Sequence, residues 1–367
     1  MTGKGLFLET NSRSVDQEDL VAGRVSFNFL EARDRLLIWY GDVARKLPWR
    51  DPITPYRVWV SEIMLQQTTV SAVVGYFERF MVRFPTVDLL AESSENDLLK
   101  LWEGLGYYQR ARNLHRAAKM IVLSGSFPRT KAQWELLPGI GPSTAGAIAS
   151  IAFGEREPIL DANVRRVNRR LFQFMDSPEK GDKLEYLWNI SRAFVELPGD
   201  SPGEVNQALM DLGATVCRIR APLCGECPLS SQCLTSRFSL DPSLPTMKRS
   251  FRRKIIRTAL VLPPEKGLTL VIRSGGRFLE GLWDFPGDVM DEVAPSEKTG
   301  RMIGRVSHVY THIEEEVLII EVDVLPTGSE NTRIFPGIRE ARAVPLTGAA
   351  KKVMRVLEKR ELHKTNG

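Results

Sequence analysis

The sequence predicts two domains of different class: an all-helical domain first, and then a domain of mixed helices and strands. From residue 27 to about residue 194, apolar residues recur at three- and four-residue spacing, which is typical of helices packed on one face. After residue 255, runs of β-type residues replace that pattern. A length of 367 residues is more than one compact domain usually holds, so two domains are expected.

These patterns divide the chain into four segments. Residues 1–25 are polar and have no period, which predicts a flexible tail. Prolines punctuate the helical domain, predicted at 26–236, and indicate short loops between its helices. A stretch rich in Ser, Pro and basic residues predicts a linker at 237–254. The change in composition already begins at about Leu234. Within the second domain, at 255–367, we expect strands at 255–262, 268–272 and 317–322 and a helix near 349–361.

The composition restricts the class of protein. The net charge of +5 is compatible with a polyanionic partner, although it is weak evidence by itself. No apolar run reaches the roughly 18 residues of a membrane helix, and the N-terminus lacks a secretory signal pattern. We therefore expect a soluble intracellular protein that binds no membrane.

All four cysteines lie within one short segment, at Cys217, Cys224, Cys227 and Cys233. Clustered cysteines in an intracellular chain indicate a metal site rather than disulfides. Four thiolates on a compact loop suit either one tetrahedral zinc ion or a [4Fe–4S] cluster. The spacing alone does not choose between the two.

A glycine-rich turn at residues 136–147 joins two helical runs. Gly139 and Gly141 allow the backbone to turn tightly and to approach a ligand closely. The free amides at the start of the following helix would then face an anion such as a phosphate. The alternative is an ordinary corner between two helices.

Two carboxylates are candidates for acid–base chemistry. Glu62 shares one helix face with Val58 and Leu65, and loss of solvation there would raise its pKa, as a general acid requires. The alternative is a glutamate in a first helical turn that is favoured by the helix dipole. Asp161 precedes a helical run, where it could serve as an N-cap and still direct one oxygen at a substrate.

Residues 47–50, 59–68 and 104–108 resemble the adenine DNA glycosylases of the MutY type. The glycine turn, which resembles a helix–hairpin–helix motif, then Asp161 and the four cysteines follow in the order of that family, so that the match covers residues 36–233. The resemblance implies an endonuclease III-like helical fold, with a [4Fe–4S] cluster held by the cysteines. It also implies an enzyme that flips adenine out of a duplex and hydrolyses its N-glycosidic bond.

The resemblance assigns roles to the acidic site. Glu62 protonates the adenine ring and later handles the incoming water, Asp161 stabilises the cationic sugar, and Asn163 helps to orient the site. Such a pair meets the two needs of glycosidic hydrolysis, a proton for the leaving group and a counter-charge for the sugar. Ala162 stands where the family has glycine, and a positive φ there would cost about 1 kcal/mol.

Ser143 occupies the position at which bifunctional relatives carry a lysine nucleophile, so we expect hydrolysis by water without strand cleavage. By the resemblance, Tyr107 enters the base stack and fills the space that the flipped base leaves. The alternative is that its ring packs in the protein core. By the same resemblance, residues that contact DNA or the lesion are Arg50, Gln67, Thr68, Leu105, Tyr107, Gly139 and Gly141.

The second domain resembles the Nudix fold at residues 281–287. The segment that follows, through Glu292 and Glu297, lacks the glutamate-rich helix of Nudix hydrolases, so we expect that fold without its catalytic site. Residues 308–312 resemble the family loop that recognises 8-oxoguanine opposite the adenine. Thr311 and His312 would distinguish the oxidised purine by hydrogen bonds, and a polar strand edge is the alternative.

The expected partner is therefore double-stranded DNA with adenine opposite 8-oxoguanine or guanine, bound by a monomer in the bacterial cytoplasm at the nucleoid. Three other interpretations stay open. The chain could be a bifunctional pyrimidine glycosylase and lyase, an iron–sulfur protein that binds DNA without catalysis, or a zinc-binding DNA module. Ser143 argues against the first, and the presence of both Glu62 and Asp161 argues against the second.

Overall fold

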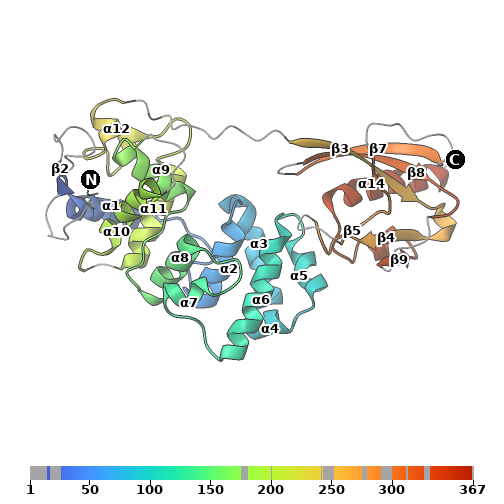
Figure 1. Ribbon diagram of the computed structural model, residues 1–367, viewed down its shortest axis with the longest axis horizontal. Coiled ribbons are helices and arrows are strands. Elements are labelled where there is room, and N and C mark those ends of the chain that lie inside the picture. Colours follow the sequence, from blue (N-terminus) through green and yellow to red (C-terminus); the bar gives the residue numbers. More distant parts are fainter. Residues whose placement is uncertain are drawn as a thin grey trace, which may run out of the picture. The chain divides into compact units, whose positions relative to one another are not determined.

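The computed structural model describes residues 15–16, 26–174, 181–199, 201–240, 242, 252–274, 279–290, 300–310, 313–325 and 331–365 (Figure 1). The chain forms two compact units. Unit 1 comprises Met1–Ala91 and Arg116–Met247, and unit 2 comprises Glu92–His115 and Lys248–Gly367. Residues 92–115 thus belong to the second unit, whereas the helical pattern alone placed them with the rest of 26–236. Most of the predicted tail and linker lies outside the described residues.

Helices make up the described chain from residue 29 to residue 237, apart from the short 3₁₀ turn η1 (Cys224–Glu226) and its loops. In chain order they are α1 (Phe29–Val43), α2 (Pro55–Leu65), α3 (Val70–Arg83), α4 (Val87–Glu92), α5 (Glu95–Trp102), α6 (Tyr108–Ser124), α7 (Lys131–Glu135), α8 (Pro142–Phe153), α9 (Ala162–Leu171), α10 (Asp182–Val195), α11 (Pro202–Thr215) and α12 (Leu234–Arg237). The last of these corrects the linker prediction, because Leu234 is buried at the start of a helix. Before α1, two short strands pair antiparallel, β1 (Val15–Asp16) and β2 (Ser26–Phe27).

Capping residues fix where the two helices of the candidate site begin. The Thr54 side chain accepts a hydrogen bond from the backbone N–H of Arg57, and Pro55 occupies the first position of α2. The Asp161 side chain caps α9 in the same way through the backbone N–H of Val164. Because α2 begins at Pro55, Glu62 lies in its third turn. The interpretation of Glu62 as a first-turn glutamate is therefore wrong.

An aromatic cluster holds the first and later helices of unit 1 together. The rings of Phe27, Phe29, Phe172 and Phe194 lie 4.7 to 6.2 Å apart in edge-on, tilted and stacked arrangements. All four side chains are buried. Such rings contribute large apolar areas and favourable edge contacts. The cluster packs α10 and the end of α9 against α1. Helix α9 is the one that Asp161 caps.

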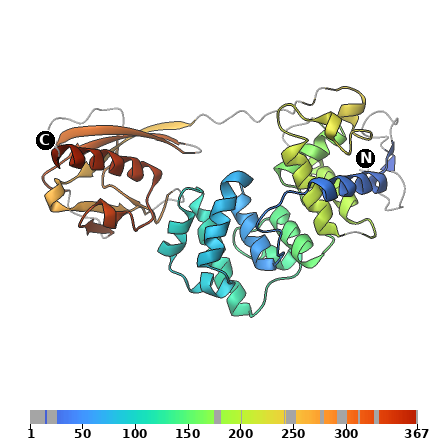
Figure 2. The ribbon, with the colours of Figure 1, turned by 180° about the vertical axis from the view of Figure 1, so that it is seen from behind.

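Unit 2 contains two sheets with a long helix packed on both (Figure 2). Its elements after residue 252 are β3 (Arg253–Val261), η2 (Pro264–Lys266), β4 (Leu268–Ile272), β5 (Trp283–Asp284), β6 (Val289–Met290), β7 (Arg301–Val309), β8 (Ile313–Glu321), β9 (Thr332–Phe335), α13 (Ile338–Ala341) and α14 (Gly348–Thr365). One sheet has the order β6-β3-β8-β7, with β3 and β8 parallel, and the other has the order β5-β4-β9. Strands β3, β4 and β8 and helix α14 lie where the sequence predicts them.

Candidate active site

A cavity of about 610 Å³ lies in unit 1 between α2, α9, α11 and the segment before α2. That volume is within the range of small-molecule sites, so a nucleobase with its sugar can enter. The polar and apolar residues that line it include Arg45, Arg50, Val58, Glu62, Leu65, Thr68, Asp161, Asn163 and Arg166. The two carboxylates singled out in the sequence therefore face one shared space.

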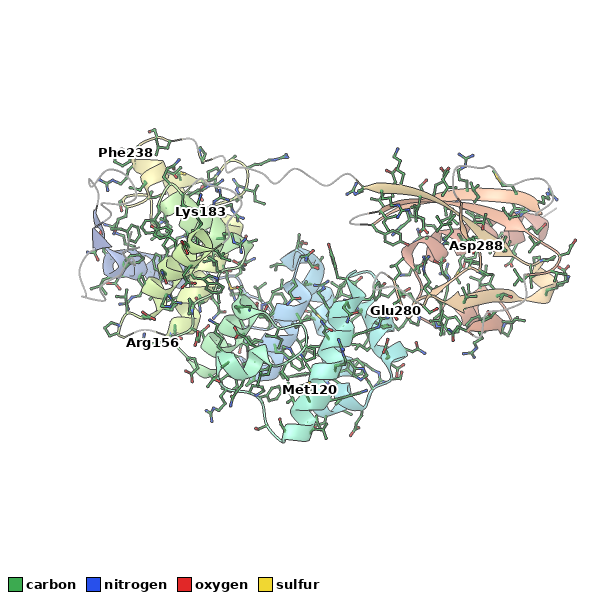
Figure 3. The ribbon with its side chains drawn as sticks, in the orientation of Figure 1. Met120, Arg156, Lys183, Phe238, Glu280 and Asp288 are labelled. Atoms are coloured by element: carbon green, nitrogen blue, oxygen red, sulfur yellow. The ribbon has the colours of Figure 1, made fainter. Side chains whose placement is uncertain are left out.

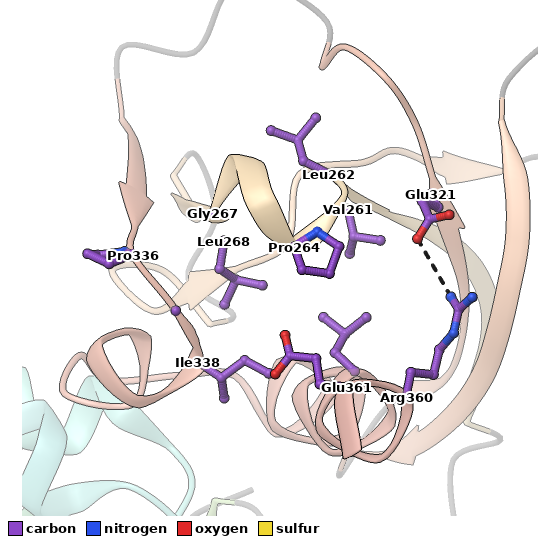
Figure 4. Close-up of a pocket in the computed structure, with 12 residues that line it drawn as sticks. Val261, Leu262, Pro264, Gly267, Leu268, Glu321, Pro336, Ile338, Arg360 and Glu361 are labelled. Carbon is purple, nitrogen blue, oxygen red and sulfur yellow. Dashed lines mark ion pairs between the residues drawn. The ribbon is translucent and has the colours of Figure 1, made fainter. Parts of the chain in front are cut away.

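A second cavity, in unit 2, is far smaller (Figure 4). Its volume of about 60 Å³ holds a few water molecules and no nucleobase. The lining is mainly apolar, with an ion pair between Arg360 and Glu321 at 3.8 Å across one side. The cavity of unit 1 is accordingly the candidate site.

Glu62 is held in its protonated form by its surroundings. Burial, and to a smaller extent the negative charge of Asp161, raise the pKa of Glu62 to about 8, while Arg50 acts in the opposite direction. The residues on its helix face, Val58 and Leu65, line the same cavity. The result is a carboxylic acid that can still donate a proton near neutral pH.

Asp161 also has a raised pKa, although its hydrogen bonds limit the effect of burial. Burial raises the pKa of Asp161, but hydrogen bonds from the backbone of Val164 and from Asn163 oppose that effect. Its Oδ1 accepts the Val164 N–H at 2.7 Å, and its Oδ2 accepts the Asn163 Nδ2 at 3.4 Å. Asp161 therefore caps α9 and faces the cavity at the same time. Ala162, the next residue, begins the helix, and it is absent from the described residues with positive φ, so the cost expected for alanine there does not arise.

Arg166 connects Asn163 to the cysteine segment. Its Nη2 donates to Asn163 Oδ1 at 2.9 Å and to the carbonyl of Gly213 at 2.6 Å, and its Nε donates to the carbonyl of Cys217 at 2.8 Å. Gly213 permits this arrangement, because a Cβ there would stand 2.6 Å from the Cβ of Asn163. The start of α9 is therefore fixed by α11 and by the first residue of the cysteine loop.

Asp211, which the sequence did not single out, orients two arginines that line the cavity, Arg45 and Arg50. Arg50 binds both carboxylate oxygens of Asp211, at 2.8 and 2.9 Å, and Arg45 Nε donates to Asp211 Oδ1 at 2.9 Å. Burial alone would raise the pKa of Asp211, but the hydrogen bonds from the two arginines outweigh it and hold the pKa below its ordinary value. The sequence feature that could have indicated Asp211 is its charge within the apolar pattern of α11.

The glycine turn between α7 and α8 has the geometry of a backbone ligand site. Gly139 has a φ of 82°, which favours glycine, and its carbonyl accepts from Gln66 Nε2 at 3.3 Å. Gly141 caps α8 with an ordinary φ of −96°, and a Cβ on it would meet no atom within 4 Å. Nothing within the protein therefore requires glycine at Gly141, and the open space beside it suits an approaching ligand.

Ser143 supports the segment before Asp161 rather than lining the cavity. Its Oγ accepts the backbone N–H of Leu160 at 3.1 Å, and Ser143 is absent from the lining residues. Thr68 does line the cavity, and its neighbour Gln67 is exposed with a φ of 58°. A non-glycine residue held in the left-handed region often marks a functional position.

Leu105 and Tyr107 belong to unit 2. Leu105 is buried, and Tyr107 has a φ of 50° with Arg110 5.6 Å from its ring centre. The strained backbone of Tyr107 is not typical of a residue that only packs in a core. Thr311 and His312 lie outside the described residues, as do Glu292 and Glu297.

The four cysteine thiols are free and influence one another electrostatically. Burial, with the neighbouring thiols, raises the pKa of Cys227 to about 12 and that of Cys233 to about 11. Arg170 Nη1 donates to the sulfur of Cys217 at 3.3 Å. Within the described ranges, no three His, Cys, Asp or Glu side chains are close enough together to hold a single ion. The donor set is nevertheless all thiol and partly enclosed.

The chain matches a known protein family and is similar in sequence to known proteins. Residues 60–193 match the family described as HhH-GPD superfamily base excision DNA repair protein. The chain is 33% identical to the adenine DNA glycosylase of Rattus norvegicus over 403 residues, which cover 89% of this chain and 78% of that protein. It is 43% identical to the adenine DNA glycosylase of Buchnera aphidicola (subsp. Baizongia pistaciae) over 201 residues, or 54% of this chain and 56% of that one.

Among solved structures, a thermostable thymine-DNA glycosylase superposes with a TM-score of 0.51 at 28% identity. The superposition covers 56% of this chain and 95% of that one. None of the helices in the described ranges combines the length and apolar character that a bilayer span requires.

Proposed function

The chain belongs to the adenine DNA glycosylases of the helix–hairpin–helix base excision repair superfamily, and from this premise we propose that it is monofunctional. It removes adenine that lies opposite 8-oxoguanine or guanine in duplex DNA, by hydrolysis, and leaves an abasic site. The observation that carries the proposal is the shared cavity of Glu62 and Asp161, in which burial is the largest cause of the raised pKa of Glu62, while Val164 and Asn163 donate hydrogen bonds to the carboxylate of Asp161.

In this reaction the N-glycosidic bond breaks, and its electron pair leaves with the adenine. Glu62 donates its proton to the adenine ring, so that the base departs neutral. The ionised Asp161 stabilises the cationic sugar, and Asn163 holds Asp161 through its amide. The Glu62 carboxylate then takes a proton from the water that adds to the sugar, which restores the acid.

The cations around the cavity support hydrolysis by water rather than attack by an amine. Among the described lining residues the basic side chains are arginines, with no lysine. Arginine stays protonated in proteins and cannot form a Schiff base with the sugar. Ser143, at the position of the lysine of bifunctional relatives, is engaged with the backbone of Leu160.

We assign DNA contacts to three regions. The amides beside Gly139 and Gly141 bind backbone phosphate at the start of α8. In unit 1, Gln67 and Thr68 contact the DNA near the extruded base, and Arg50 lines the pocket of that base. Leu105 and Tyr107 are the DNA contacts assigned to unit 2. Thr311 and His312, in the Nudix-like second unit, recognise the 8-oxoguanine. The enzyme acts as a monomer at the bacterial nucleoid.

The four cysteines would hold a [4Fe–4S] cluster. Their donor set is all thiol, which suits the iron atoms of such a cluster. Such a cluster would bind the ends of the loop together and so stabilise the fold around Cys217. Through Arg166, the position of Cys217 is linked to that of Asn163.

The decisive experiment measures free adenine released from duplex DNA that carries adenine opposite 8-oxoguanine. We expect release by the wild type, and binding without release by a Glu62→Gln variant, which keeps the shape and loses the proton. Glu78→Gln, an exposed glutamate on α3, is the matched control and should be as active as the wild type.

Two results would reject the proposal. One is full adenine release by the Glu62→Gln variant. The other is a covalent adduct between the protein and DNA on treatment with borohydride, because only an amine nucleophile forms one.

A further inference from the structure

Gln66, the residue that follows α2, joins the end of that helix to the glycine turn and to the start of α8. Its Nε2 donates to the carbonyl of Gly139 at 3.3 Å and to Thr144 Oγ1, also at 3.3 Å. Gly139 precedes α8, and Thr144 lies in its first turn. The side-chain amide carries two N–H donors on one nitrogen, so Gln66 can bind both acceptors at once. These bonds connect residues that are 73 and 78 positions apart in the sequence.

Helices α2 and α8 also pack on each other, but apolar packing alone does not fix their relative position along the helix axes. Most of the side chains that α8 buries are small, namely Ala145, Gly146, Ala147, Ala149 and Ser150. Small side chains form only shallow ridges, and apolar attraction has no direction, so such a face can pack at more than one position. A hydrogen bond depends on distance and angle. The two bonds from Gln66 therefore select one position of α2 along α8.

The other end of α8 is attached to a different helix. Gly154 ends α8 with a φ of 74°. Arg156, which is labelled in Figure 3, follows it and donates to the carbonyls of Val195 at 3.0 Å and of Leu197 at 2.5 Å. These bonds attach the end of α8 to the end of α10. The contact with Gln66 is made at the opposite end, where the glycine turn leads into α8.

In the sequence, Gln66 lies between the proposed proton donor and a segment at the edge of the cavity. Glu62 precedes it by four residues, or about one helical turn. After it, the backbone N–H of Thr68 donates to the carbonyl of Leu65 at 3.1 Å, and Thr68 Oγ1 donates to the carbonyl of Gln66 at 3.4 Å. Glu62, Leu65 and Thr68 line the cavity, whereas Gln66 is not among the described residues that line it. Gln66 therefore holds the segment that carries these groups without itself facing the substrate.

We propose that Gln66 is a positioning residue that sets the distance between a DNA phosphate bound at the glycine turn and the carboxyl group of Glu62. The inference rests on the proposed function, in which backbone amides at the start of α8 bind that phosphate. The covalent bonds of the DNA backbone limit how far the sugar of the extruded adenine lies from the phosphate. A shift of α2 along α8 would therefore move Glu62 away from the adenine, and a misplacement of about 1 Å costs a factor of about 100 in rate.

The test separates the rate of adenine release from the affinity for DNA, with the full-length protein. The single-turnover rate is measured at saturating duplex with adenine opposite 8-oxoguanine, and the active fraction is taken from the burst of product at excess DNA. The dissociation constant is measured by fluorescence anisotropy in the Glu62→Gln background, which prevents cleavage. Gln66→Met keeps the length of the side chain and loses both donors. We expect it to lower the rate at least about tenfold, with the dissociation constant within about twofold of that of the parent protein.

A second variant tests whether the bond to Thr144 carries part of this effect. Thr144→Val removes one of the two acceptors and should lower the rate about fivefold. In the double variant the rate should be no lower than in Gln66→Met alone, because that variant has already lost the bond. The matched control is Gln133→Met, which removes an amide that accepts from the backbone N–H groups of Arg129 and Thr130 before α7. The control should leave the rate and the affinity unchanged.

Each outcome decides the inference. A Gln66→Met variant that keeps the wild-type rate, or whose affinity falls as much as its rate, overturns it. So does a double variant in which the two losses of rate multiply, because the side chains then act independently. If Gln66→Met fails to fold by thermal melting, Thr144→Val decides the question by the same comparison of rate with affinity. A wild type that releases no adenine from this duplex rejects the proposed function itself, and with it the positioning role, whatever the variants do.

Discussion

Two carboxyl groups share one cavity, and their surroundings differ. Asp161 caps a helix and receives the backbone N–H of Val164, which stabilises its negative charge. Glu62 lies in the third turn of α2, beside the charge of Asp161, and burial is the largest influence on its pKa. These surroundings support the proposed roles of Glu62 as proton donor and of Asp161 as counter-ion.

The pH dependence of adenine release follows from the pKa of Glu62, which burial raises from 4.5 to about 8. The acid form is needed for proton donation, so we expect the single-turnover rate to be high below pH 8 and to fall as the pH rises through that value. The measurement is the rate between pH 6 and 9.5 in buffers of constant ionic strength. A rate that stays constant up to pH 9.5 would contradict the assignment.

The same shift affects stability with a definite sign. The folded protein binds the Glu62 proton more tightly than the unfolded chain, so the free energy of unfolding decreases as the pH rises from about 4.5 to about 8. Glu62→Gln removes this penalty and should therefore be more stable than the wild type at pH 8.5. Urea unfolding at pH 5 and at pH 8.5 compares the two proteins, and Glu78→Gln should show no such difference.

At the scale of elements, the site depends on how closely α9 and α11 approach. Gly213 faces the start of α9, where even a methyl group would meet the Asn163 Cβ at 2.6 Å and its carbonyl oxygen at 3.0 Å. The same helix α11 supplies Asp211, which orients Arg45 and Arg50 on the far side of the cavity. One helix thus determines the spacing of the acidic group and the orientation of the basic group.

Gly213→Ala tests this close approach. We expect the displaced α9 to lower the single-turnover rate of adenine release by about 100-fold, since a shift of about 1 Å at a site costs that much. Overpacking should also cost about 1–3 kcal/mol of unfolding free energy. Gly41→Ala is the matched control, because a Cβ on Gly41 meets no atom within 4 Å and helix interiors prefer alanine. Wild-type rates in Gly213→Ala would show that the helix spacing is unimportant.

At the scale of the whole molecule, charge governs the encounter with DNA. The net charge of +5 is modest, and several arginines line the cavity. The proposed phosphate site at the start of α8 would use backbone amides and no net charge. We therefore expect few phosphate contacts beside the proposed base pocket.

This balance predicts a moderate dependence of duplex affinity on salt. The logarithm of the association constant should fall linearly with the logarithm of salt concentration, with a slope of about −0.9 for each phosphate contacted. Fluorescence anisotropy between 50 and 300 mM salt, with the Glu62→Gln variant to prevent cleavage, measures the slope. A fully paired duplex without adenine mismatch is the control and should bind more weakly with a similar slope. Affinity independent of salt would contradict phosphate binding.

Local patterns in the sequence determined the division into a helical and a mixed part, the strands β3, β4 and β8, and the helix face of Glu62. They succeeded there because periodicity is set by neighbours in the chain, and a buried strand or helix face repeats it over many residues. The strand β7, largely exposed, and the short strand β9 carry too little apolar alternation to be found in this way.

Only the tertiary structure decided which distant groups meet. Asp211 binds Arg50 across 161 residues of sequence, and Glu103 meets Leu346 across 243. No local pattern encodes such pairs, because the contact depends on how whole helices pack and on the desolvation that burial imposes. The raised pKa values of Glu62 and Asp161 have the same origin, since burial is the largest cause of both.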